Sequence, residues 1–285
     1  MTTMAEFTAS DVAKLREMTG VGMMECKKAL VEANGNLEAA VEILRKKGKA
    51  GADTKSQKEA REGLIVAHIA AGGKLGVLAE INCQTDFVAR NDDFKAFADE
   101  VAKAYAANPN VDLESRRTEM VAKIGENIRL ARNSRLEVSG AGQVAAYIHT
   151  GAKVGVLVEV GCSKDDTTTK DEFKQLVKDI ALHIASPASP RWLRREDVPT
   201  DAVGEQERYA RAQAKEAGKP DQVIEKIVAG KIDAFYGDNV LLEQPFVKDD
   251  SKTVQQLLDE VGAKVGEKVA VRRFVRYKLG ESGEE

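Results

Sequence analysis

The residues of this 285-residue chain best suited to catalysis or metal binding are its three cysteines and three histidines. Cys26, Cys83 and Cys162 lie far apart and are odd in number, which fits neither a disulfide framework nor a metal site with paired ligands. His149 has no Cys, His or acidic cluster at ligand spacing beside it, and we interpret it as a surface residue. The histidines have no evident nucleophile to serve, and no Gly-x-Ser-x-Gly signature occurs. The sequence therefore predicts a protein that is not an enzyme, with no catalytic, cofactor-binding or metal-binding residues.

Two segments that contain glycine and lysine could be mistaken for phosphate-binding loops. They are Gly72-x-Lys74-x-Gly76 and Gly151-x-Lys153-x-Gly155. Both lack the longer glycine spacing and the Lys-Ser/Thr pair that opens a helix in such loops. We interpret both as turns of β-hairpins.

These segments belong to an internal duplication. The sequence LGVLAEINC from Leu75 recurs as VGVLVEVGC from Val154, an offset of 79 residues (154 − 75). At the same offset, FKAFADEVA from Phe94 recurs as FKQLVKDIA from Phe173. Positions that are alike in both copies are candidates for shared scaffold, and positions that are unusual in one copy are candidates for function.

Phe87 is unusual in this sense. Residues 85–88 read Thr-Asp-Phe-Val, whereas their counterparts, residues 164–167, read Lys-Asp-Asp-Thr. The segment falls between the end of a strand and the start of a helix, where side chains usually face water. A Phe at such a loop tip is either a hydrophobic staple onto its own helix or a plug for a pocket of another protein. Position alone leaves both alternatives open.

Two other pairs of residues have structural interpretations. Cys83 and Cys162 are repeat equivalents at strand ends, and we interpret them as core residues. Met23 and Met24 are adjacent at a helix start, so they cannot share one helix face, and one must point away from the local core. Partner contact and packing against the following linker both remain open for that methionine.

The elements that must position these residues begin with three short helices. Thr8 can cap the first, with Asp11 three residues on, and Gly20 ends it. A second helix spans roughly residues 23–33, and Asn36 can cap a third, whose apolar stripe has helical spacing. The stripe consists of Leu37, Ala40, Val41 and Leu44.

The rest of the chain predicts an α+β fold with two copies of an antiparallel β-hairpin, each followed by a covering helix. Two charged helical runs flank a Gly-Lys-Pro break at 218–220, which predicts an antiparallel coiled-coil arm inserted in copy two. The expected domains are a three-helix bundle at 1–50, a basic linker at 51–62, copy one of the core at 63–140, copy two at 141–190 and 239–285, and the arm at 191–238.

Charge and hydropathy restrict the partners. There are 43 basic and 46 acidic residues, for a formal net charge of -3, so no global positive field attracts nucleic acid. The basic residues between Arg45 and Arg61 have no interleaved aromatic residue, and we interpret them as a solvated connector rather than a nucleic-acid or ribosome contact. No window approaches the ~20 apolar residues that span a bilayer. We expect a soluble, cytoplasmic protein with no membrane or direct nucleic-acid partner.

Several longer motifs resemble those of bacterial elongation factor Ts. They are LREMTGVGMMECKKALVEANGNLEAAVEILR at 15–45, TDFVARN at 85–91, KIGENI at 123–128, GKP at 218–220 and QPFVKDDSKTV at 244–254. The resemblance covers nearly the whole chain. It implies a ubiquitin-associated-like bundle, a duplicated core and a coiled-coil insertion.

The resemblance also implies a function. Members of this family exchange guanine nucleotide on elongation factor Tu, binding its GDP-bound and nucleotide-free forms. The residues that would disturb the Mg²⁺ site of the partner are Thr85, Asp86, Phe87 and Val88. The residues that would bind the partner elsewhere are Met23, Met24, Lys27, Ile124, Gly125 and His149. For Phe87 the resemblance favours the plug over the staple.

One departure from the family concerns the C-terminal residues 279–285, LGESGEE. Longer family members continue past the final strand into a helix that contacts the partner. We expect any contact of that helix to be absent here or supplied elsewhere.

Overall fold

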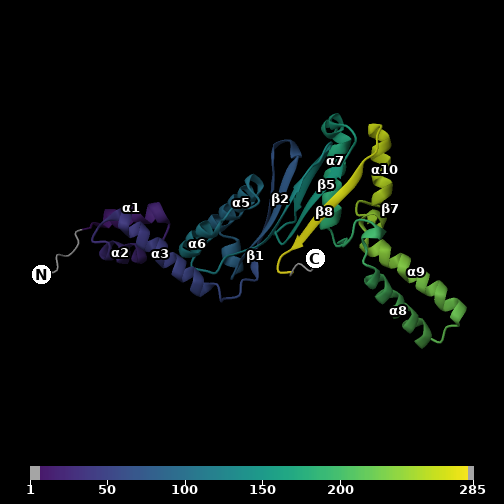
Figure 1. The fold of residues 1–285 in the computed structure, drawn as a ribbon, viewed down its shortest axis with the longest axis horizontal. Helices are drawn as coiled ribbons and strands as arrows, with labels where there is room; N and C mark the ends of the chain where they lie inside the picture. Colours follow the sequence, from purple (N-terminus) through teal and green to yellow (C-terminus); the bar gives the residue numbers. More distant parts are fainter. Residues whose placement is uncertain (1–6, 282–285) are drawn as a thin grey trace. The chain divides into compact units, whose positions relative to one another are not determined.

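The computed structural model describes residues 7–281 and has the expected α+β fold (Figure 1). The chain forms two compact units. Of the described residues, the first unit holds those up to Val66, Ala79–Asn133 and those from Leu279 on, and the second holds Ala67–Leu78 and Ser134–Lys278. None of the helices formed by residues 7–281 is long and apolar enough to cross a membrane.

The first unit begins with three helices, α1 (Ala9–Thr19), α2 (Met23–Glu32) and α3 (Leu37–Lys55). Both predicted caps are present: Asp11 N–H donates to the Thr8 side chain, and Ala39 N–H donates to the Asn36 side chain. Leu15, Cys26 and Leu30 are fully buried between the helices. These contacts account for the stability of helices too short to persist alone.

Helix α3 continues beyond the expected end of the bundle at residue 50. It ends at Lys55, so the first part of the expected linker is helical. The extension carries Ala52, which is buried, and α3 packs against α6 (Glu114–Ile124). The large apolar residues of α3 end before residue 50, but the helix continues to Lys55. Alanine has a high helix propensity, and burial of Ala52 stabilises this extension.

Two three-stranded sheets follow. The first has the order β1-β2-β3, and the second has the order β4-β5-β8. In the second, both strand pairs are antiparallel, with Ala145 opposite Val158 and Val158 opposite Phe274. Their bounds are β1 (Glu62–Ile69), β2 (Leu75–Cys83), β3 (Arg129–Glu137), β4 (Gly142–Ile148), β5 (Val154–Gly161) and β8 (Ala270–Lys278). Each sheet is therefore a predicted hairpin joined by a strand from later in its copy.

A glycine at the start of each hairpin shows how closely the copies agree. Gly63 and Gly142 stand 79 residues apart and have φ of 146° and 149°. A Cβ at Gly63 would lie 2.1 Å from the carbonyl oxygen of Ile81, and one at Gly142 would lie 2.6 Å from that of Val160. Only glycine allows this backbone conformation and this approach.

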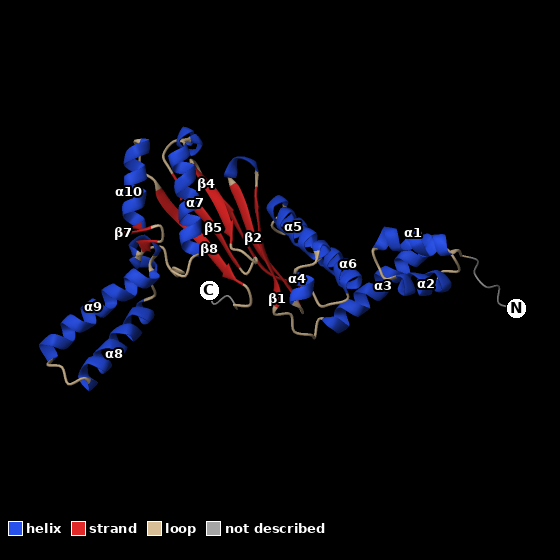
Figure 2. Cartoon of the chain, turned by 180° about the vertical axis from the view of Figure 1, so that it is seen from behind, coloured by secondary structure: helices blue, strands red, loops and turns tan. Residues whose placement is uncertain are grey.

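A helix covers the second sheet as predicted, and the equivalent helix of copy one buries equivalent residues. Helix α5 (Asp92–Ala107) buries Phe94, Phe97 and Val101, and α7 (Asp171–Ala185) buries their counterparts in copy two. Figure 2 shows α7 along the β4-β5-β8 sheet, where it contacts β4 and β5, and α10 (Val254–Val265) packs against α7. The buried residues of α5 and α7 recur at helical spacing, so each helix has one apolar face.

The structure extends the duplication to a part that the sequence comparison did not detect. The segments AKIGENI from Ala122 and AKVGEKV from Ala263 are 141 residues apart (263 − 122). Each ends a helix at a left-handed glycine, Gly125 with φ 90° and Gly266 with φ 78°, and each leads into the third strand of its sheet. The offset exceeds 79 because the arm and its flanks are inserted in copy two.

The inserted arm consists of α8 (Thr200–Glu216) and α9 (Asp221–Asn239), which pack on each other. A short strand pair, β6 (Pro245–Phe246) and β7 (Asp249–Thr253), then leads to α10. Small residues on α8 allow the close approach of branched residues on α9. The buried set is Ala210, Ala214, Ile224 and Val228. The helical hairpin matches the prediction, while its coiled-coil character remains a prediction.

Candidate functional site

Phe87 lies on α4 (Asp86–Ala89), a single helical turn between β2 and α5. Its side chain is 80% exposed, so the staple alternative is wrong. The apolar contact of this turn is made instead by Ala89, which is buried. A large aromatic side chain left in water has a high free energy that a partner's pocket can lower.

A network of hydrogen bonds fixes the start of α4. Thr85 caps the turn, because Val88 N–H donates to its hydroxyl over 3.3 Å. The Glu126 carboxylate accepts from Gln84 N–H and Thr85 N–H, both over 3.1 Å, and from the Thr85 hydroxyl over 2.7 Å. Hydrogen bonds to an ionised acceptor are the stronger kind. Phe87 therefore stands on a turn whose backbone direction is set.

Asp86 precedes Phe87 on the same turn and is partly exposed. Its carboxylate pairs with Arg90 one turn later, at 2.9 Å; the Arg90 side chain is largely exposed and that of Asp86 is partly exposed. Such exposed pairs contribute little to stability. Asp86 can therefore leave its ion pair with Arg90 and interact with a group of a partner protein with little loss of stability.

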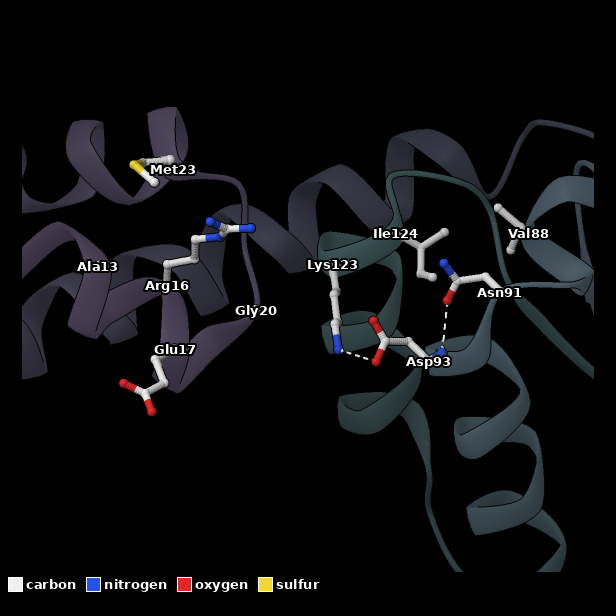
Figure 3. Close-up of a pocket in the computed structure, with 10 residues that line it drawn as sticks. All are labelled: Ala13, Arg16, Glu17, Gly20, Met23, Val88, Asn91, Asp93, Lys123 and Ile124. Carbon is white, nitrogen blue, oxygen red and sulfur yellow. Dashed lines mark hydrogen bonds and ion pairs between the residues drawn. The ribbon is translucent and has the colours of Figure 1, made fainter.

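A hollow of about 610 Å³ opens beside this turn within the first unit (Figure 3). Three of the predicted partner-contact residues line it: Met23 from α2, Val88 from α4 and Ile124 from the end of α6. The hollow thus brings together the bundle, the Thr-Asp-Phe-Val segment and the KIGENI segment, which lie far apart in the sequence.

Some of the polar residues that line the hollow are engaged in ion pairs and hydrogen bonds with one another. Figure 3 shows Lys123 paired with Asp93 at 2.8 Å, and Asp93 N–H donating to the Asn91 side chain over 2.9 Å. This hydrogen bond caps the start of α5. Arg16 and Glu17 of α1 supply opposite charges on the bundle side. The hollow is therefore a mixed apolar and charged surface, which is the composition of a protein contact rather than of a small-molecule pocket.

The remaining predicted residues are also at the surface. Met24 and Lys27 are exposed on α2, as is Met23, so both methionines face solvent. Gly125 is exposed at the left-handed end of α6. His149 is exposed in the second unit, with its Nδ1 3.5 Å from the Tyr147 hydroxyl.

Cys26, Cys83 and Cys162 are all buried, which confirms the interpretation of Cys83 and Cys162 as core residues. Burial and the nearby Glu126 carboxylate raise the pKa of Cys83 to about 12. Burial also raises the pKa of Cys162. Protonated thiols are poor nucleophiles, so neither Cys83 nor Cys162 is activated for nucleophilic attack.

The structure also identifies residues that the sequence analysis missed. Glu126 belongs to the KIGENI motif but was not predicted to have a role, although its carboxylate accepts a hydrogen bond from the backbone at the start of α4. Its counterpart Glu267 accepts from Ser163 N–H over 2.9 Å, at the equivalent point of copy two. The signal was present in the sequence as the repeat at offset 141, but the insertion hides it from a comparison at offset 79.

Comparison with known proteins places this arrangement in a family. The family model described as Elongation factor TS matches residues 84–281. Proteins named Elongation factor Ts from Trichlorobacter lovleyi and Symbiobacterium thermophilum are 43% and 44% identical to this chain, over 96% and 98% of its length and 93% of their own. One from Nitratiruptor sp. is 42% identical over 96% of this chain and 93% of its own length. The chain belongs to the elongation factor Ts family.

Proposed function

We propose that the chain is a guanine-nucleotide exchange factor for elongation factor Tu, acting in the cytoplasm during translation elongation. It binds the GDP-bound and nucleotide-free forms of the GTPase and catalyses no chemical step of its own. The observation that carries the proposal is the exposed Phe87 on its fixed turn, in a chain whose relatives are named Elongation factor Ts. Phe87 enters the partner beside its Mg²⁺ site and loosens the nucleotide.

The energetics follow from linkage. A GTPase holds GDP through a phosphate cradle and a Mg²⁺ ion that bridges phosphate and protein oxygens. A factor that binds the nucleotide-free form more tightly than the GDP form must weaken GDP binding by the same ratio. Phe87 supplies part of this difference if the pocket that receives it opens only when the Mg²⁺ region is distorted.

Phe87 alone is insufficient. Burial of a Phe side chain gives roughly 1.5 to 3 kcal/mol. Accelerating GDP release by, for example, 10⁴-fold requires about 5.4 kcal/mol. The remainder must come from other contacts, and the residues around the hollow supply a surface for them. In this proposal Met23 and Ile124 hold the partner while Asp86 perturbs the hydrogen bonds around the ion.

The experiment is release of a fluorescent GDP from elongation factor Tu, followed by stopped flow while the concentration of the chain is varied. We expect release to accelerate and then saturate as the chain is added. No acceleration, together with steeply salt-dependent RNA binding in a gel shift, would contradict the proposal and favour a nucleic-acid-binding module.

A further inference from the structure

Glu126 is a carboxylate whose partners lie about forty residues earlier in the chain. One oxygen accepts from the N–H groups of Gln84 and Thr85, and the other accepts from the Thr85 hydroxyl. Two consecutive N–H groups and one hydroxyl that converge on one carboxylate define both the position and the direction of the backbone that enters α4. Glu126 is half-buried, which shields these bonds from competition by water.

The same contact fixes a second element. Thr85 is the cap of α4, and its hydroxyl, while donating to Glu126, accepts from Val88 N–H. Phe87 sits inside that capped turn and is 80% exposed, so its direction depends on the turn rather than on packing of the ring. A side chain presented in its binding orientation loses less entropy when it is captured.

Glu126 also connects two predicted contact segments. It follows Gly125, whose left-handed conformation ends α6 next to Ile124. Val88, from α4, and Ile124, from α6, line the same hollow. A hydrogen bond from Thr85 to Glu126 therefore holds α4 in register with the end of α6.

Copy two provides an internal control. Glu267 accepts from Ser163 N–H, so a carboxylate at this point belongs to the duplicated scaffold. Lys164 stands in place of Thr85 and has no hydroxyl, and no side chain caps the following turn at Lys164. In copy two the Glu267 carboxylate interacts instead with the hydroxyls of Thr167 and Ser163. A hydroxyl that both contacts the carboxylate and caps the turn is thus found in copy one, which carries the exposed aromatic residue.

From these contacts we infer that Glu126 is a positioning residue for Phe87. Its carboxylate holds the Thr85-capped turn so that Phe87 enters the partner while Ile124 and Gly125 are docked. This inference rests on the proposed exchange function. Glu126 itself touches neither nucleotide nor Mg²⁺.

The experiment compares Glu126→Ala and Glu126→Gln in the full chain, in the fluorescent-GDP release assay. The maximal rate and the half-saturating concentration are measured separately. If the turn without its carboxylate spends a tenth of the time in the competent orientation, the maximal rate falls about tenfold. Glutamine has the same length, and its amide can accept from both N–H groups and donate to the Thr85 hydroxyl oxygen. Glu126→Gln should therefore stay within about threefold of wild type, because the bonds rather than the charge matter.

Glu267→Ala is the matched control, because it removes the equivalent carboxylate from the copy without the aromatic residue. We expect its maximal exchange rate to equal that of wild type within about twofold. Thermal unfolding of both alanine variants measures any shared loss of stability. If Glu126→Ala does not fold, Thr85→Val tests the same contact, since it removes the hydroxyl and keeps the shape.

A double variant separates positioning from general destabilisation. With Phe87→Ala already present, adding Glu126→Ala should leave the maximal rate unchanged, because there is no aromatic side chain left to position. A further tenfold fall in that background would overturn the inference, as would a wild-type rate for Glu126→Ala alone. Either result would leave the proposed exchange function standing. That proposal would fail instead if the wild-type chain did not accelerate GDP release from elongation factor Tu.

Discussion

The two copies of the core share a loop architecture but differ at its tip. In each, a cysteine at the end of a strand donates its thiol proton to the carbonyl two residues on, over 3.2 Å: Cys83 to Thr85 and Cys162 to Lys164. The exposed tip is Phe87 in copy one and Asp166 in copy two. The buried contacts are therefore shared by both copies as scaffold, while the exposed aromatic residue belongs to one copy.

The ion pairs of two buried glutamates support the same conclusion. Glu80 pairs with Arg132 at 2.8 Å, and Glu159 pairs with Arg273 at 2.7 Å. Both glutamates are buried, and the two pairs are related by the offsets 79 and 141. Glu159 also pairs with Arg272, at 3.0 Å. A buried carboxylate without a cationic partner is strongly destabilising, so a glutamate and its arginine are constrained together.

The largest expected effect concerns the shared scaffold. Phe94→Ala and Phe173→Ala each remove a fully buried ring from equivalent positions of the two covering helices. Each should lower the free energy of unfolding by about 3 to 5 kcal/mol. Denaturant titration of both variants measures this. A loss confined to one of them would show that the copies do not share one packing scheme.

The next largest effect concerns the exposed loop residues of the two copies, Phe87 and Asp166. Phe87→Ala should reduce the rate of GDP release by roughly 10- to 150-fold, the equivalent of 1.5 to 3 kcal/mol for one buried Phe. Asp166→Ala, at the matching tip of copy two, should leave the rate unchanged. Because both side chains are exposed, neither substitution should change thermal stability by more than a degree or two. An equal loss of exchange from both would contradict the assignment of function to copy one.

A smaller effect is expected at Asp86. Asp86→Ala should reduce the maximal rate of exchange more than the affinity for the nucleotide-free partner, by about tenfold or less, because the carboxylate acts where the Mg²⁺ ligands are disturbed. Fluorescence titration gives the affinity, and stopped flow gives the rate. A drop in affinity alone would make Asp86 a docking residue.

The smallest effect is a pH dependence confined to copy two. His183 is buried, and its counterpart at offset 79 is Ala104. Its Nδ1 accepts from Val247 N–H over 3.2 Å, and Nε2 donates to the Gln244 side chain over 2.9 Å, so the ring is neutral. Burial lowers the pKa of His183 below its ordinary value of 6.5, an effect opposed by the Gln244 hydrogen bond.

The sign of this effect follows from linkage. Since the pKa of the folded state is the lower one, the stabilisation is fully present above pH 6.5 and is lost as the pH falls toward the folded-state value. Thermal unfolding between pH 7.5 and 5 should show a loss of stability that His183→Gln lessens. Equal acid sensitivity in wild type and variant would contradict this origin.

Much of this organisation could be predicted from the sequence, because local patterns determine it. The caps at Thr8 and Asn36, the apolar stripe of α3 and the hairpins each depend on residues a few positions apart. The exposed Phe87 could be singled out because the duplication supplied a reference. These are effects of helix and strand periodicity and of capping chemistry, which act within one element.

The parts that could not be predicted depend on contacts between distant segments. Helix α6 and strand β3 carry mixed polar sequences, and their place follows from burial of residues such as Val121 and Ile128 against the core. The contact of Glu126 with Thr85 spans 41 residues. The hollow requires three segments to converge. No local pattern encodes such proximity, although the repeat at offset 141 would have drawn attention to Glu126.

The measurement that tests the central claim most directly is the ratio of GDP-release rates for wild type and Phe87→Ala, determined with elongation factor Tu at millimolar Mg²⁺ and again in excess EDTA. If Phe87 acts by disturbing the Mg²⁺ site, the ratio should be roughly 10 to 150 with Mg²⁺ and should approach one when the ion has been removed. An unchanged ratio in EDTA would contradict the account and would assign Phe87 to docking alone.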